Sequence, residues 1–182
     1  MLTDKTIVLG ISGGIAAYKA ADLASKLTQA GARVEVIMTA AATKFITSLT
    51  LRSLTNRPVI TDMFEMASEF SIEHVSLAEA ADIVVVAPAT ANIIAKMAVG
   101  IANDALSTTV LATEAPVVVA PAMHTKMFQN SITQENLAKL KARGFTIIEP
   151  EYGRLASGGT GIGRLPEREK IIGVIEQVLE KG

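Results

Sequence analysis

The chain has 182 residues, of which 49% are apolar and 19% charged, and its formal net charge is −1. This composition excludes intrinsic disorder, and the small net charge gives no electrostatic reason to expect nucleic acid. The absence of cysteine excludes disulfides, thiolate metal sites and a thiol nucleophile. No apolar stretch is long enough to cross a bilayer, and Asp4 and Lys5 interrupt any signal-like segment. We therefore expect a cytoplasmic protein with no metal site and no membrane partner.

Short apolar runs that end at small or polar residues predict five buried strands. They cover Thr6–Ile11, Arg33–Met38, 83–87, 117–120 and 145–148. Because the runs show little polar alternation, they are typical of parallel strands that are buried on both faces.

Helix-length segments separate these runs. Residues 15–30 are mostly good helix formers, and Gly31 suits the end of that helix. Residues 76–79 form a capping-box pattern that predicts the start of a short helix. Thr133 is predicted to cap a further helix, which stops at Gly144.

The C-terminal segment predicts an amphipathic helix, with Pro166 at its first position and Ile171 and Ile175 on its apolar face. Alternation of strands and helices favours an α/β fold with right-handed crossovers. We predict one domain over residues 1–182, a doubly wound parallel sheet of the Rossmann-like or flavodoxin-like kind.

Four short segments are candidates for one binding site: residues 10–15, 88–92, 121–124 and 154–158. Three of them lie at or just beyond the end of a predicted strand. Ligands bind at the carboxyl ends of the strands in open α/β sheets. We therefore expect a single cofactor site rather than four unrelated loops.

The first of these segments suits a phosphate group, because a strand, Ser12-Gly13-Gly14 and a helix follow one another. The spacing differs from the dinucleotide pattern G-x-G-x-x-G, and the second strand is followed by Thr39 rather than by an acidic residue. A mononucleotide therefore fits better than NAD. The alternative is a tight strand–helix turn that holds no ligand.

Taken together, the segments resemble the flavin-dependent cysteine decarboxylases, most closely the branch that acts on 4′-phosphopantothenoylcysteine in coenzyme A biosynthesis. The resemblance covers nearly the whole chain and implies FMN as the cofactor. With Ser12 of the glycine loop included, FMN contacts are expected at Ser12, Gly13, Gly14, Ile15, Thr39, Thr90, Asn92 and Ala122. The resemblance also implies substrate contacts at His124, Arg154, Leu155 and Ala156, and an acid–base role for His74.

The chain departs from the family pattern at two positions of the expected site. Ser157 stands where the family has a catalytic cysteine that donates a proton, and His124 stands where it has a substrate-binding asparagine. A serine hydroxyl holds its proton far more tightly than a thiol. Either the proton comes from elsewhere, for example from water, or the serine is a deliberate substitution, or the reaction stops one step early.

The chemistry implied by the resemblance is oxidation of the cysteine to a thioaldehyde, loss of CO₂ to give an enethiolate, and reduction to 4′-phosphopantetheine. The expected partners are the small-molecule substrate, a separate ligase, and further copies in a homo-oligomer built from trimers, with His74 at a subunit boundary. One alternative is a peptidyl-cysteine decarboxylase that stops at the enethiol. Another is a non-catalytic, flavin-binding regulatory subunit, and a flavin prenyltransferase fits residues 121–124 less well.

Overall fold

The computed structural model describes residues 2–64 and 73–181, without the side chains of Glu73 and His74. The parallel strands are β1 (Thr6–Ile11), β2 (Arg33–Met38), β3 (Val59–Ile60), β4 (Ile83–Ala89), β5 (Val117–Pro121) and β6 (Thr146–Ile147). An antiparallel hairpin follows, formed by β7 (Glu151–Arg154) and β8 (Thr160–Arg164). The helices are η1 (Ile15–Tyr18), α1 (Lys19–Gln29), η2 (Ala42–Lys44), α2 (Ser48–Thr55), α3 (Glu73–Ala80), α4 (Ala91–Val99), α5 (Ala105–Ala112), α6 (Thr125–Phe128), α7 (Ser131–Ala142) and α8 (Arg168–Leu179).

The main sheet has the strand order β3-β2-β1-β4-β5-β6. This is the Rossmann order, in which the chain first winds outward from β1 to β3 and then returns to the other side of β1. The predicted doubly wound α/β fold is confirmed, and the order distinguishes it from the flavodoxin arrangement. No helix in the described part of the chain is long and apolar enough to span a bilayer.

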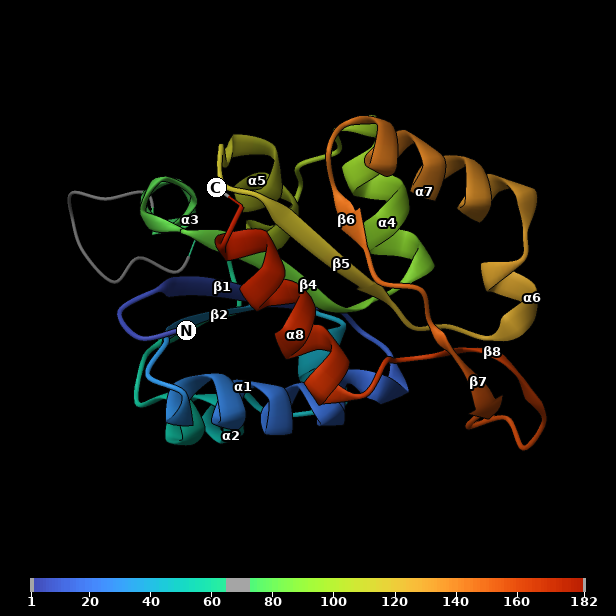
Figure 1. Ribbon diagram of the computed structural model, residues 1–182, viewed down its shortest axis with the longest axis horizontal. Helices are drawn as coiled ribbons and strands as arrows, with labels where there is room; N and C mark the ends of the chain where they lie inside the picture. Colours follow the sequence, from blue (N-terminus) through green and yellow to red (C-terminus); the bar gives the residue numbers. More distant parts are fainter. Residues whose placement is uncertain (1, 65–72, 182) are drawn as a thin grey trace.

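Helices cover both faces of this sheet (Figure 1). Ile7 and Leu9 of β1 belong to a buried cluster with α1, α2 and α8, whereas Val8 belongs to a second cluster with α4, α5 and α7. Gly10 lies on the face of Val8, and Leu106 of α5 occupies the space that a side chain at Gly10 would need. Because one cluster covers each face of the sheet, both faces of the central strands are buried, and their sequences are continuous apolar runs.

Three predicted helix starts are wrong. Ser76 lies inside α3 rather than at its start. Asn130, not Thr133, caps α7, and its side chain accepts a hydrogen bond of 2.9 Å from the Ile132 amide. Helix α8 begins two residues after Pro166, because the intervening Glu167 is still extended. A capping side chain is a local signal that occurs more often than helices begin.

Several strand bounds also differ from the predictions. Strand β4 runs two residues beyond the predicted segment 83–87, β5 runs one residue beyond 117–120, and β6 is two residues shorter than 145–148. Helix α2, strand β3 and the β7–β8 hairpin have no counterpart among the predicted elements. The hairpin is rich in glycine and mostly exposed, so it lacks the apolar pattern by which buried strands are recognised.

A partly buried ion pair joins α4 to the start of α5. Lys96 Nζ lies 2.7 Å from Asp104 Oδ2. The other carboxylate oxygen, Oδ1, accepts a hydrogen bond of 2.8 Å from the Ser107 amide, so Asp104 also caps α5. Burial raises the pKa of Asp104, but the hydrogen bonds from Lys96 and Ser107 outweigh this effect and hold it below its usual value. The carboxylate is therefore charged at neutral pH, as the cap requires.

Candidate functional site

The carboxyl ends of the adjacent strands β2, β1, β4 and β5 lie at one edge of the sheet. The loops that follow them are residues 39–41, 12–14, 90–92 and 122–124, which we call the carboxyl rim. The winding direction changes between β1 and β4, and this switch point is where ligands bind in open α/β sheets. The structure thus brings three of the four predicted segments together.

Ser12 joins the two loops at the switch point. It is 1% exposed, and its hydroxyl donates a hydrogen bond of 2.6 Å to the Pro88 carbonyl and accepts one of 3.0 Å from the Thr90 amide. The hydroxyl thus donates one hydrogen bond and accepts one within the protein, and the predicted contact of Ser12 with the cofactor stays a prediction. Its role in the structure is to position the loop that follows β4.

Gly13 and Gly14 form the narrowest part of the rim. A side chain at Gly13 would lie 2.7 Å from the carbonyl carbon of Ala41, so only glycine allows the β1 and β2 loops to touch. Gly14 precedes η1, and its carbonyl accepts the Ala17 amide at 2.9 Å. The first amides of η1, including that of Ile15, have no helical carbonyl before them and suit an anion.

Two threonines of the rim cap the turns that follow them. The Thr39 hydroxyl accepts a hydrogen bond of 3.2 Å from the Ala42 amide, and the Thr90 hydroxyl accepts one of 3.3 Å from the Ile93 amide at the start of α4. Each hydroxyl keeps its own proton to donate. Asn92 is exposed in the first turn of α4, so its amide is free to reach the same edge.

The loop after β5 connects the rim to the hairpin. The Ala122 amide donates to the Ala89 carbonyl at 3.0 Å, and the Met123 amide donates to the Gly163 carbonyl of β8 at 2.9 Å. The Thr125 hydroxyl adds a bond of 2.7 Å to the Ile162 carbonyl. Thr125 was not among the predicted residues, because a threonine at the start of a helix carries no signal of a long-range contact.

His124 caps α6 beside this junction. Its Nδ1 accepts a hydrogen bond of 3.2 Å from the Lys126 amide. The ring proton of the neutral imidazole then lies on Nε2, and the exposed ring has this N–H to donate. His124 therefore suits the recognition of a carboxylate.

The predicted substrate residues lie at the tip of the hairpin. Leu155 closes the tip through hydrogen bonds of 2.8 Å with Gly159 and 2.9 Å with Gly158. Leu155 is half-buried, whereas Arg154, Ala156 and Ser157 are exposed. Among the described residues, no hydrogen bond joins these three side chains to the carboxyl rim. The base of the hairpin is anchored, and its tip is open to solvent.

His74 lies in α3, and its side chain is outside the described residues. Figure 1 shows α3 at the opposite end of the sheet from α6 and the β7–β8 hairpin. Within one chain, the structure therefore does not place α3 at the carboxyl rim.

The bonds of Ser12 predict a measurable loss of stability on removal of its hydroxyl. Ser12→Ala leaves the Thr90 amide and the Pro88 carbonyl without this partner, and should lower the free energy of unfolding by about 1–3 kcal/mol. Urea unfolding followed by circular dichroism measures the change. As the control, Ser53→Ala removes an exposed hydroxyl that bonds only within α2, and should cost less than about 0.5 kcal/mol. Equal losses in the two variants would contradict the role assigned to Ser12.

Comparison with known proteins shows which family this chain resembles. Residues 1–180 match the family model described as Flavoprotein. The coenzyme A biosynthesis bifunctional protein CoaBC of Vibrio vulnificus (strain YJ016) is 49% identical over 179 residues, which are 98% of this chain and 45% of that protein. The chain thus spans less than half the length of this relative.

Two solved structures share the fold across nearly the whole chain. A cysteine-to-serine mutant of PPC decarboxylase, complexed with pantothenoylaminoethenethiol, superposes with a TM-score of 0.90 and 31% identity, covering 97% of this chain and 99% of its own. The FMN-dependent cysteine decarboxylase SpaF superposes with a TM-score of 0.85 and 29% identity, covering 100% and 98%.

Proposed function

The chain belongs to the flavoprotein family, and we propose that its residues 1–182 form one domain that binds FMN and decarboxylates 4′-phosphopantothenoylcysteine in coenzyme A biosynthesis. The observation that carries this proposal is the 49% identity to a coenzyme A biosynthesis protein, which extends over 98% of the chain and so includes every loop of the carboxyl rim. A cytoplasmic location and a ligase that supplies the substrate belong to the same proposal.

The carboxyl rim fits the phosphate of FMN. A side chain at Gly14 would project to 3.6 Å from the Thr90 methyl group and fill the space between the β1 and β4 loops. The amides of Gly14 and Ile15, at the start of η1, would hold the phosphate, and Thr39 has a hydroxyl proton to donate to it. Thr90, Asn92 and Ala122 would contact the remainder of the cofactor from the neighbouring loops.

The residues around the rim have distinct tasks in this reaction. Bound FMN supplies an acceptor and donor of a hydride at the carbon that carries sulfur, which provides the electron sink for loss of CO₂. The Nε2–H of His124 would bind the substrate carboxylate, and the exposed Arg154 would bind the substrate phosphate. Leu155 and Ala156 would cover the substrate with the tip of the hairpin, which excludes water while the thioaldehyde and the enethiolate exist.

His74 would act as the acid–base residue on the substrate thiol, from a neighbouring subunit. Its helix, α3, lies at the opposite end of the sheet from α6 and the hairpin, so we infer that it would serve the rim of another copy (Figure 1). Near α3, helix α5 carries the exposed Leu111, and Val99 and Ile101, at and just after the end of α4, are exposed as well, so these apolar side chains are candidates for a surface that a second copy would cover. A homo-oligomer built from trimers brings the two parts together.

This assembly predicts the mass of the protein in solution. Light scattering at micromolar concentration should give about three times the chain mass of 19.1 kDa, or a multiple of that trimer. Leu111→Arg should reduce the mass, because it places a charge in the proposed contact. A monomer for the unmodified protein would contradict both the assembly and the location of His74 at a subunit boundary.

The proposed activity predicts both the cofactor and the product. FMN should be released without covalent attachment when the protein is denatured and should be identified by chromatography. Mass spectrometry should then show loss of CO₂ from 4′-phosphopantothenoylcysteine and no change in a peptide that ends in cysteine. NAD, FAD or no cofactor at saturating FMN would contradict the proposal.

A histidine variant separates binding from chemistry in the same assay. His74→Asn should retain FMN but lose CO₂ release, because the amide fills similar space without taking up a proton. Full activity of His74→Asn would assign the acid–base role to another residue.

A second candidate function is supported by Ser157. A peptidyl-cysteine decarboxylase that stops at the enethiol needs no proton donor for a final reduction, so a serine at this position suits it. Conversion of the cysteine-ending peptide, with 4′-phosphopantothenoylcysteine unchanged, would favour this second function.

If the chain acts on 4′-phosphopantothenoylcysteine, Ser157 predicts which step of the reaction is slow. Flavin bleaching and CO₂ release should proceed, whereas formation of 4′-phosphopantetheine should be slow because Ser157 is a poor acid. Ser157→Cys should speed this last step by about 10²-fold or more without changing the rate of bleaching, both followed by rapid-quench mass spectrometry and absorbance. Ser157→Ala, the matched control, should behave like the unmodified protein. An unmodified protein as fast as Ser157→Cys would show that another group gives the proton.

A further inference from the structure

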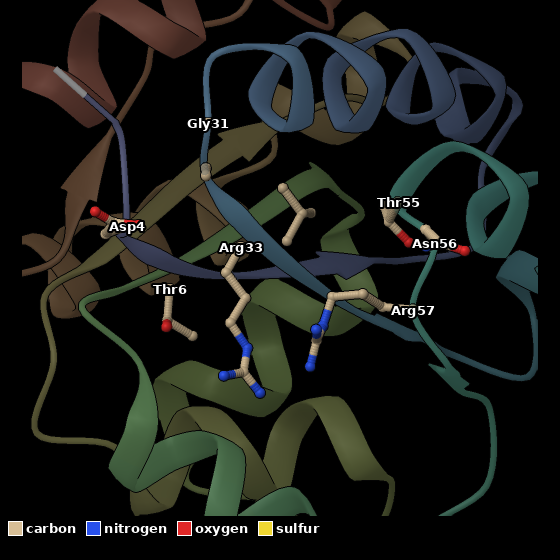
Figure 2. A pocket seen from close by; sticks show the side chains of 9 residues that line it. Asp4, Thr6, Gly31, Arg33, Thr55, Asn56 and Arg57 are labelled. Carbon is tan, nitrogen blue, oxygen red and sulfur yellow. The ribbon is translucent and has the colours of Figure 1, made fainter.

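A cavity of about 520 Å³ opens at the amino ends of β1 and β2, at the opposite edge of the sheet from the carboxyl rim. Figure 2 shows Arg33 and Arg57 extending side by side from its wall, with Thr6 and Asn56 on either side of them. Arg33 begins β2, and Arg57 lies in the loop between α2 and β3. None of these residues belongs to the proposed decarboxylation site.

One buried carboxylate holds the two guanidinium groups in place. Glu35 is 6% exposed. Its Oε1 accepts hydrogen bonds from Arg33 Nε at 2.9 Å and from Arg57 Nε at 2.7 Å, and lies 2.6 Å from Arg57 Nη2. Arg33 is thus held through Nε, and Arg57 through Nε and Nη2. The outer nitrogens of Arg33, whose side chain is 58% exposed, remain available to a ligand.

The pair carries more positive charge than its own carboxylate neutralises. Two guanidinium groups stay charged at any physiological pH, and Glu35 balances one of them. Asp82 is already paired with Lys5 at 3.0 Å. Asp4 lines the cavity but forms no ion pair with either arginine among the described residues. In the view of Figure 2, Arg33 lies between Asp4 and Arg57. The arginine pair therefore presents a surplus positive charge in a fixed geometry.

We propose that the Arg33–Arg57 pair is a second ligand site, which binds the phosphate group of a small phosphate monoester. A planar guanidinium fork matches the oxygens of a phosphate. The cavity volume lies within the range of small-molecule sites and exceeds what a phosphate ion alone requires. Thr6 and Asn56 contribute polar groups for the hydroxyls of the esterified part. This site is independent of the proposed function.

The test is phosphate titration of the full chain saturated with FMN, followed by ¹⁵N–¹H spectra at constant ionic strength with chloride as the balancing anion. Saturable shifts are expected at the amides of Gly31, Ala32 and Asn56, and glycerol phosphate should bind more tightly than inorganic phosphate. Arg33→Gln should weaken binding about tenfold. This variant leaves Glu35 paired with Arg57, so the fold is retained. Arg168→Gln, which removes an arginine paired with Asp22 and Glu169 elsewhere, is the control and should change nothing.

Each contrary outcome has a distinct meaning. Shifts that chloride reproduces, or that Arg33→Gln leaves unchanged, would overturn the site. Equal affinity for glycerol phosphate and inorganic phosphate would overturn the assignment to a monoester. If the protein binds no FMN, phosphate shifts at the Gly13 and Gly14 amides report on the carboxyl rim alone, and those at Gly31 and Asn56 still test the arginine pair.

Discussion

The carboxyl rim depends on hydrogen bonds that run from one loop to the next across the ends of the strands. Ser12 joins the β1 loop to the β4 loop, the Ala122 amide joins the β5 loop to the end of β4, and the Met123 amide joins the same loop to β8. A strand that ends at the sheet edge leaves backbone groups that must find partners. Here the neighbouring loop supplies them, so the spacing of the loops is set before any ligand arrives, which lowers the entropy that binding must offset.

Small residues at the carboxyl rim leave backbone amides and hydroxyl groups accessible to a ligand. Gly13 packs against Ala41, and Gly14 lies beside Thr90, so no large side chain separates the β1 loop from its neighbours. What remains to meet a ligand is mostly backbone N–H and threonine hydroxyl. Such groups recognise a phosphate without carrying a full charge. A chain with a net charge of −1 could therefore bind the phosphate that we propose at this edge.

The sequence predicts best those parts of the fold that burial dictates. Strands β1 and β2 have the predicted bounds, because a strand that is covered on both faces must be apolar throughout. The helix starts predicted at Ser76 and Thr133 are wrong, because a residue type that can cap a helix does not by itself begin one. The rim loops were found because each follows a strand, but sequence alone could not reveal the direction of a side chain. Ser12 points into the neighbouring loop, and no pattern of residues distinguishes that contact from contact with a ligand.

The hairpin has an anchored base and an exposed tip, and this difference bears on the final proton transfer of the proposed reaction. Contact of Gly163 with Met123, and of Thr125 with Ile162, fixes the direction in which the hairpin leaves the rim. Beyond Leu155 the tip is exposed, so in the proposed reaction a group there would exchange protons with bulk water until the hairpin covers a substrate. A thiol at position 157 would carry its own proton into the closed site. A serine hydroxyl does not release its proton readily, so with Ser157 the proposed reaction would take its proton from water that enters before closure or from another side chain such as His124. In the proposed reaction, the residue at the tip would therefore determine when the proton is loaded, and the base of the hairpin would determine where it is delivered.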